Sequence, residues 1–174
     1  MIFADVRDST SLAESKGPSE FKEIINRFYK ESSRVLIAHN AMVNRLMGDQ
    51  VIALFVPRFA GKDHAKVALY AAQELLIVTG HGDADGPWVP VGAGIHTGLA
   101  HVGAVGSADG VTEIAVLGSA ANMRARLSSK AAAGEFLISE DSVKSGNLDV
   151  EGLETRSLEL KGVRQPMSVR VIKV

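Results

Sequence analysis

Two aspartates occupy positions where a β-sheet can bring their carboxylates together. Asp5 follows the apolar residues 1–4, which predict a first strand, and Asp49 lies with Gly48 in a tight turn between two apolar segments. Carboxylates at a strand end and at a hairpin turn of one sheet can converge, and such a pair suits two Mg²⁺ or Mn²⁺ ions that hold a triphosphate. Taken alone, Asp49 also fits an ordinary turn residue, and Asp5 fits a loop residue or a helix cap. The pair is therefore a candidate metal site that depends on the residues around it.

The segments around these carboxylates alternate between helical and strand patterns. Apolar residues at helical spacing predict helices from Pro18 to about residue 38, after a cap at Asp63, and from a cap at Ser119 to about residue 131. A short helix is expected after Ser139, and the expected strands are 1–4, 41–46, 50–56, 89–96, 99–105, 135–138, 156–160 and 167–174. The order is β-α-β-β-α-β followed by further elements. It predicts an α+β fold with a ferredoxin-like core, additional C-terminal strands, and helices packed on a mostly antiparallel sheet.

Composition limits the classes of partner and compartment. The 174 residues are 46% hydrophobic and show no linker, low-complexity tract or repeat, so a single domain over residues 1–174 is expected, alone or within a longer protein. With 19 basic and 20 acidic residues the net charge is −1, which gives no general attraction to nucleic acid or to an anionic membrane. Cysteine is absent, and no apolar run approaches the ~20 residues of a membrane-spanning helix. We expect a cytoplasmic domain.

Five sequence blocks, in order, resemble the class III adenylate and guanylate cyclases. Residues 3–7 (FADVR) and 47–55 (MGDQVIALF) are similar to the two metal-binding blocks of that family. Residues 94–98 (GIHTG) resemble its central hairpin, and residues 116–127 (VLGSAANMRARL) resemble its signature helix. Residues 160–162 (LKG) match its terminal block. Each block is weak alone, but five in register over nearly the whole chain are specific.

The resemblance implies roles for particular residues. Asp5 and Asp49, with the backbone carbonyl of Val6, would bind two Mg²⁺ or Mn²⁺ ions. Asn122 would orient the ribose, and Arg126 would stabilise charge at the α-phosphate while the 3′-hydroxyl attacks and expels pyrophosphate.

Further family positions would contact the phosphates. Lys161 would meet the terminal phosphates as a point charge, and the turn containing Ser9 and Thr10 would offer backbone donors. In this family the metal ligands and the Asn and Arg come from different subunits. The resemblance therefore implies a head-to-tail homodimer with two composite sites.

Three departures from the family pattern leave the substrate and the activity open. Arg45 stands where adenylate cyclases carry Lys and guanylate cyclases often Glu, and Ala115, where Asp or Thr is usual, has no hydrogen-bonding side chain. These favour ATP over GTP only slightly, because a Glu that would bind guanine donors is missing. Asp8 replaces a common Gly and adds a negative charge beside the phosphates.

Two alternatives to an adenylate cyclase follow from these departures. One is a guanylate or low-specificity cyclase, and the other is a non-catalytic nucleotide-binding or dimerisation module. A diguanylate cyclase or polymerase-palm relative is disfavoured, because the Gly-Gly-Asp/Glu-Glu-Phe signature is missing around Gly48 and Asp49.

Overall fold

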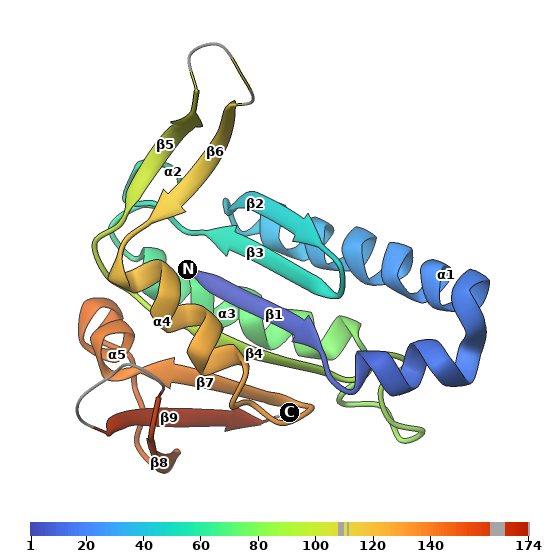
Figure 1. Ribbon diagram of the computed structural model, residues 1–174. Coiled ribbons are helices and arrows are strands. Elements are labelled where there is room, and N and C mark those ends of the chain that lie inside the picture. The colour runs from blue at the N-terminus through green and yellow to red at the C-terminus, as the bar shows by residue number, and fades with distance from the viewer. Residues whose placement is uncertain (108–109, 111, 161–165, 174) are drawn as a thin grey trace.

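The computed structural model describes every residue except 108–109, 111, 161–165 and 174. A seven-stranded sheet forms its centre, with α1 and α3 on one face and α4 on the other (Figure 1). A two-stranded ribbon of β5 and β6 projects away from the sheet as an arm (Figure 1). The helices are α1 (Ser9–Ala38), α2 (Pro57–Ala60), α3 (His64–Val78), α4 (Ser119–Ser128) and α5 (Glu140–Gly146). The strands are β1 (Ile2–Val6), β2 (Met42–Met47), β3 (Gln50–Leu54), β4 (Val91–Ile95), β5 (His101–Gly106), β6 (Thr112–Leu117), β7 (Glu135–Ser139), β8 (Glu154–Leu158) and β9 (Met167–Lys173).

The sheet confirms the predicted ferredoxin-like α+β core. Its strand order is β2-β3-β1-β4-β7-β9-β8, and the first four strands have the arrangement that a β-α-β-β-α-β chain produces. All neighbouring strands run antiparallel except β4 and β7, which are parallel. The additional C-terminal strands extend one edge of the sheet, as expected.

Two separate hydrophobic cores lie on the two faces of the sheet, and alternate side chains of β1 point toward opposite faces. Ile2, Ala4 and Val6 point into the larger core, which is formed with α1 and α3. A smaller core on the other face contains Leu127 of α4 and residues of β7 and β9. Since Asp5 has the opposite parity to Ala4 and Val6, it lies on the face of the sheet that α4 covers.

The long N-terminal helix begins earlier than the sequence pattern predicts. α1 starts at Ser9, but Gly17 has φ 73° and ψ 164°, so Pro18 opens a second helical segment at the predicted place. The polar segment before Gly17 carries little apolar periodicity, which is why its helix was not predicted. The interruption needs a residue that tolerates positive φ, and glycine does so without strain.

Two predictions about the middle of the chain were wrong. The strands around Thr97 and Gly98 do not pair with each other, because β4 lies in the main sheet and β5 pairs with β6, which was not predicted. Ser119 is the first residue of α4, not its cap. Gly118 holds the cap position with φ 129°, a conformation that turns the chain from β6 into the helix. Asp63 does precede α3 as predicted, although its side chain makes no capping hydrogen bond.

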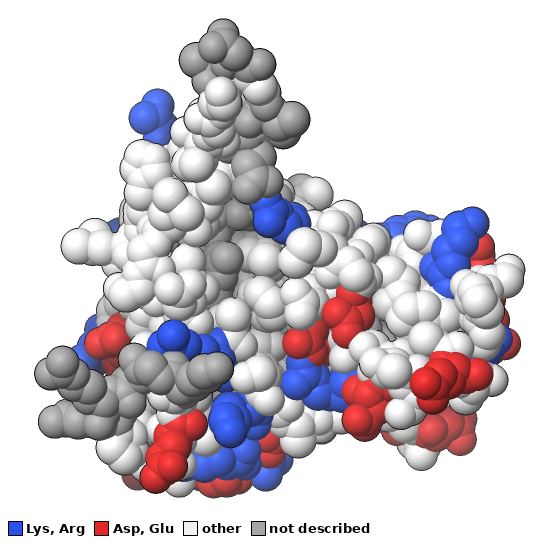
Figure 2. All heavy atoms as spheres, viewed as in Figure 1, with Lys and Arg blue, Asp and Glu red and all other residues white. Residues whose placement is uncertain are grey.

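The arm carries apolar side chains on a surface that faces solvent in the single chain. Leu99, just before β5, is 96% exposed, and Ile114 of β6 is 54% exposed. In the view of Figure 2 most of the described surface of the arm is free of Lys, Arg, Asp and Glu. An apolar projection of this kind is typical of a surface that another protein covers.

Candidate active site

The structure brings the end of β1 beside the turn between β2 and β3. Asp5 is the register partner of Gln50, and the amide of Val6 donates to the carbonyl of Asp49 at 3.0 Å. The Asp5 side chain is 15% exposed. The two aspartates therefore lie at neighbouring positions on one edge of the sheet, as the strand-end and hairpin pattern predicted.

The first turn of α1 contacts the same edge. The hydroxyl of Ser9 donates to Oδ2 of Asp49 at 2.5 Å, and the amide of Leu12 donates to the carbonyl of Asp8 at 2.9 Å. The Leu12 bond is the first of the helical ladder, so the amides of Ser9 and Thr10 precede it and have no acceptor within the helix. The helix thus presents donors of partial positive charge beside Asp49, which suits a bound anion.

Asp8 sits at this helix start in a left-handed conformation. Its φ is 53° and ψ is 32°, its side chain makes no capping hydrogen bond, and the residue is exposed. Exposure allows the carboxylate to be solvated, which lowers the cost of its charge.

Arg7 is a contributor that sequence reasoning missed. Its guanidinium forms an ion pair with Asp5 and donates to the carbonyls of Ser128 and Ala131 at 3.2 and 3.3 Å. Burial lowers the pKa of Arg7, while the nearby carboxylates of Asp49 and Asp8 oppose that shift. The two-residue spacing from Asp5 is a signal that could have placed both on one strand face, but the contact with the end of α4 is tertiary and was not predictable.

Tyr29 of α1 packs against the larger core and also has a polar contact with the site. Its hydroxyl donates to the carbonyl of Gly48 at 2.7 Å. Burial and the nearby charge of Asp49 raise the pKa of Tyr29, so the phenol stays protonated and keeps donating. This bond fixes the turn that carries Asp49 against α1.

Asn122 and Arg126 lie one helical turn apart on α4, on the face of the sheet that also holds Asp5. Asn122 is exposed and Arg126 is partly buried. Among the described residues, neither side chain makes a hydrogen bond or an ion pair with Asp5 or Asp49. A single chain therefore does not join the two halves of the predicted site.

The remaining predicted residues are distributed over other elements. Arg45 is partly buried on β2, next to an irregularity in its pairing with β3, and Ala115 is partly buried on β6 opposite Gly103. Lys161 lies outside the described residues.

The donors at the edge of β1 and the β2–β3 turn fit a hard divalent cation. Two carboxylates, a backbone carbonyl and a hydroxyl supply only oxygen ligands, which Mg²⁺ and Mn²⁺ prefer. Within the described part of the chain no three His, Cys, Asp or Glu residues cluster, so other ligands of the ions would come from water and phosphate. Such sharing is usual for ions that bind with a triphosphate.

Comparison with known proteins decides the family. The sequence model of the adenylate and guanylate cyclase catalytic domain matches residues 1–173. The chain belongs to this family. It is a class III nucleotidyl cyclase domain, which agrees with the resemblance found in the sequence.

Proteins named adenylate cyclases and a protein named a guanylyl cyclase are all similar to this domain. Adenylate cyclase 1 of Rhizobium meliloti (strain 1021) is 29% identical over 131 residues, which cover 72% of this chain and 20% of that protein. The crystal structure of the guanylyl cyclase Cya2 has a TM-score of 0.84 at 26% identity and covers 98% of this chain and 88% of that one. The adenylyl cyclase CyaB from P. aeruginosa has a TM-score of 0.82 at 23% identity, with 99% and 92% covered.

The cyclase domain spans about a fifth of the Rhizobium relative, so that protein contains much beyond this region. Within the described residues of this chain, no helix combines the length and apolar character needed to cross a membrane.

Proposed function

We propose that this domain converts ATP into 3′,5′-cyclic AMP and pyrophosphate in two composite sites of a homodimer. The observation that carries the proposal is that Asp5, near the end of β1, lies beside Asp49 in the β2–β3 turn. Both are next to the amides at the start of α1. Two divalent ions held there by Asp5, Asp49 and the Val6 carbonyl would supply positive charge to the 3′-hydroxyl and the phosphates.

The chain's own residues then bind and orient the nucleotide. The amides of Ser9 and Thr10 would donate to phosphate oxygens, and Lys161 would contribute charge at the terminal phosphates. Arg126 of the partner copy would donate to the α-phosphate, where charge increases as the hydroxyl attacks. Asn122 would hold the ribose in line.

The homodimer is supported by two features of the single chain. Among the described residues, Asn122 and Arg126 make no hydrogen bond or ion pair with the aspartates, although family resemblance assigns all four to one reaction. The arm exposes apolar side chains that association would cover.

The base preference depends on Arg45 and Ala115. Ala115 offers no hydrogen bond to a purine edge, whereas Arg45 can donate to adenine N1 or to guanine O6. This composition favours a guanylate or low-specificity cyclase as the second candidate. The exposed charge of Asp8 beside the phosphate donors favours a third, a nucleotide-binding module without turnover.

Product formation by the purified domain separates these candidates. ATP and GTP would be supplied in turn, with Mg²⁺ and with Mn²⁺, over a range of protein concentrations. We expect cyclic AMP as the main product and a specific activity that rises with protein concentration. Equal rates with both nucleotides would favour the low-specificity enzyme, and nucleotide binding without product would favour the module.

Asp49→Asn tests the metal site within the same assay. The amide keeps the acceptor for Ser9 but loses the charge that a divalent ion needs, so we expect turnover to fall by about 100-fold or more with little change in melting temperature. Asp63→Asn is the matched control, because it removes an exposed carboxylate at another helix start. Turnover by Asp49→Asn equal to that of the control would overturn the metal assignment.

A further inference from the structure

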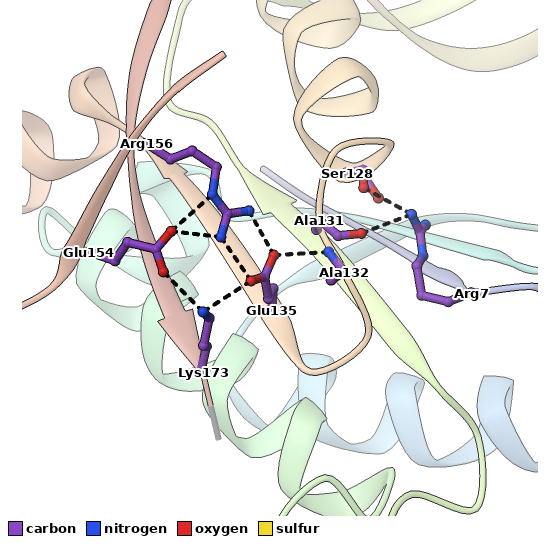
Figure 3. A network of polar contacts seen from close by, with 8 residues as sticks. All are labelled: Arg7, Ser128, Ala131, Ala132, Glu135, Glu154, Arg156 and Lys173. Atoms are coloured by element: carbon purple, nitrogen blue, oxygen red, sulfur yellow. Dashed lines mark hydrogen bonds and ion pairs between the residues drawn. The ribbon is translucent and has the colours of Figure 1, made fainter.

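Arg7 makes polar contacts on two sides at once, directly after β1. Its amide donates to the carbonyl of Pro90 at 2.7 Å, and its side chain is 16% exposed. One side of its guanidinium is paired with Asp5. The other donates to the carbonyls of Ser128, the last residue of α4, and of Ala131, just beyond it (Figure 3). Carbonyls at a helix C-terminus carry partial negative charge, so a guanidinium is well suited to this position.

Gly92 makes this contact sterically possible. A Cβ at Gly92 would lie 2.7 Å from the carbonyl oxygen of Ala132 and 3.2 Å from Cδ of Arg7. The segment after α4 therefore crosses directly over β4, with the Arg7 side chain beside it. The packing leaves no space for a side chain at that point.

The same segment is fixed on its far side by Glu135. The carboxylate of Glu135 accepts from the amide of Ala132 at 3.0 Å and forms two hydrogen bonds of 2.9 Å with Arg156 (Figure 3). Residues 128–132 are thus held between Arg7 and an ion pair whose carboxylate is buried. Arg7 in turn connects a fixed structural segment to the carboxylate of Asp5.

We propose that Arg7 is a positioning residue, which holds the Asp5 carboxylate against the fixed end of α4 in the orientation that a divalent cation requires. The inference rests on the proposed function, in which Asp5 is a metal ligand. Oδ1 of Asp5 pairs with Arg7, and Oδ2 would bind the cation. Partners of this kind, one contact away from the ion, orient its ligands, and their loss commonly weakens metal binding 10- to 100-fold.

The charge of Arg7 also has an effect of opposite sign on metal binding, and the choice of variant separates the two effects. The positive charge of Arg7 repels a cation, so simple removal of that charge would strengthen metal binding. Arg7→Lys keeps the charge but not the planar fork that serves Asp5, Ser128 and Ala131 together. Arg7→Met loses both. Orientation therefore predicts weaker binding in both variants, with Arg7→Lys affected at least as much as Arg7→Met.

The experiment measures Mn²⁺ affinity by the electron paramagnetic resonance signal of free Mn²⁺, with saturating 3′-deoxy-ATP, which lacks the attacking hydroxyl. Melting temperature is recorded in parallel, and kcat and KM are measured with ATP. Arg156→Gln is the matched control, because it removes a guanidinium from the same network without contacting Asp5, while Glu135 keeps its bond to the amide of Ala132. We expect about tenfold weaker Mn²⁺ binding and at least a tenfold lower kcat for Arg7→Lys. Arg156→Gln should lower only the melting temperature.

Three outcomes would overturn the inference. Native Mn²⁺ affinity in both Arg7 variants would leave Arg7 a purely structural residue. Stronger binding in Arg7→Met with native binding in Arg7→Lys would make it a competitor of the cation. Absence of Mn²⁺ binding and turnover in the native protein would contradict the proposed function as well, whereas a native enzyme with unaffected variants would contradict only the role of Arg7.

Discussion

At the residue scale, Asp8 is the main departure of this chain from the turn that the family resemblance assigns to phosphate binding. The position has φ 53°, which glycine adopts without strain and which Asp and Asn tolerate better than other side chains. The backbone geometry of the turn is therefore kept, and the departure from the family is one of charge. An exposed carboxylate next to a triphosphate costs on the order of 1 kcal/mol through repulsion.

We predict that Asp8→Gly and Asp8→Asn both lower KM for ATP about fivefold, which is the effect of removing roughly 1 kcal/mol of repulsion. The unfolding free energy should change by less than about 1 kcal/mol, since Gly relieves the left-handed conformation but increases chain entropy in the unfolded state. Steady-state kinetics at low ionic strength and urea unfolding measure the two quantities. Unchanged KM in both variants would place the carboxylate away from the nucleotide.

The sequence predicted the neighbouring positions of Asp5 and Asp49 because both depend on local features, a strand end and a tight turn. It did not predict the roles of Arg7 and Tyr29. The apolar pattern of α1 accounts for the ring of Tyr29 but not for the acceptor of its hydroxyl. The acceptors of Arg7 belong to residues more than a hundred positions away in the chain, and no local pattern encodes them.

At the element scale, the strands that line a core were all predicted, whereas one of the two exposed strands of the arm was not. The central strands β1, β3, β4 and β7 are almost entirely buried, and their apolar runs are unmistakable. β6 lies in the projecting arm, where neither face packs on a core of the same chain. Without a buried face, β6 has no alternation of apolar and polar residues that would mark it as a strand, and it was not predicted.

The ion-pair network around Glu135 joins β7 to β8 and β9 and should make stability depend on pH. Hydrogen bonds from Arg156 lower the pKa of Glu135 to about 2, and Lys173 lies 3.4 Å from the same carboxylate. A carboxylate whose pKa is lower in the folded state stabilises the fold above its unfolded pKa. That contribution is lost as pH falls from about 4.5 toward 2.

We predict that Glu135→Gln lowers the unfolding free energy by an amount on the order of 2 to 3 kcal/mol at pH 7, as the buried carboxylate is 6% exposed. The difference between native and variant proteins should shrink steadily below about pH 4.5, because the native carboxylate loses its advantage there. Urea unfolding between pH 3 and pH 7 measures this difference. A difference that stays constant over the range would show that packing, and not ionisation, accounts for the loss.

At the scale of the whole molecule, one chain contains both halves of the proposed cyclase site, and no hydrogen bond or ion pair among the described residues joins them. The aspartates lie where β1 ends beside the β2–β3 turn, and Asn122 and Arg126 lie on α4. The projecting arm exposes apolar side chains that a second copy would cover. A head-to-tail pair would complete two equivalent sites and would bury that surface.

Mixing two inactive variants tests this arrangement. Asp49→Asn lacks the metal half of its site and Arg126→Ala lacks the helix half, so each homodimer should be inactive. A mixed dimer would contain one site with both defects and one site with neither. After random exchange about half of the dimers are mixed, and each has one of two sites intact, so we expect roughly a quarter of the native specific activity.

The informative control is a mixture of Asp5→Asn with Asp49→Asn, where every site of every dimer receives a damaged metal half. This mixture should stay inactive whatever the extent of subunit exchange, so recovery confined to the first mixture would identify sites built from two chains. Failure of the first mixture to recover, with exchange demonstrated independently by mass spectrometry, would mean that each site is built within one chain. In that case α4 would have to move to bring Arg126 to the aspartates of its own chain, and association through the arm would regulate that movement and would not complete the site.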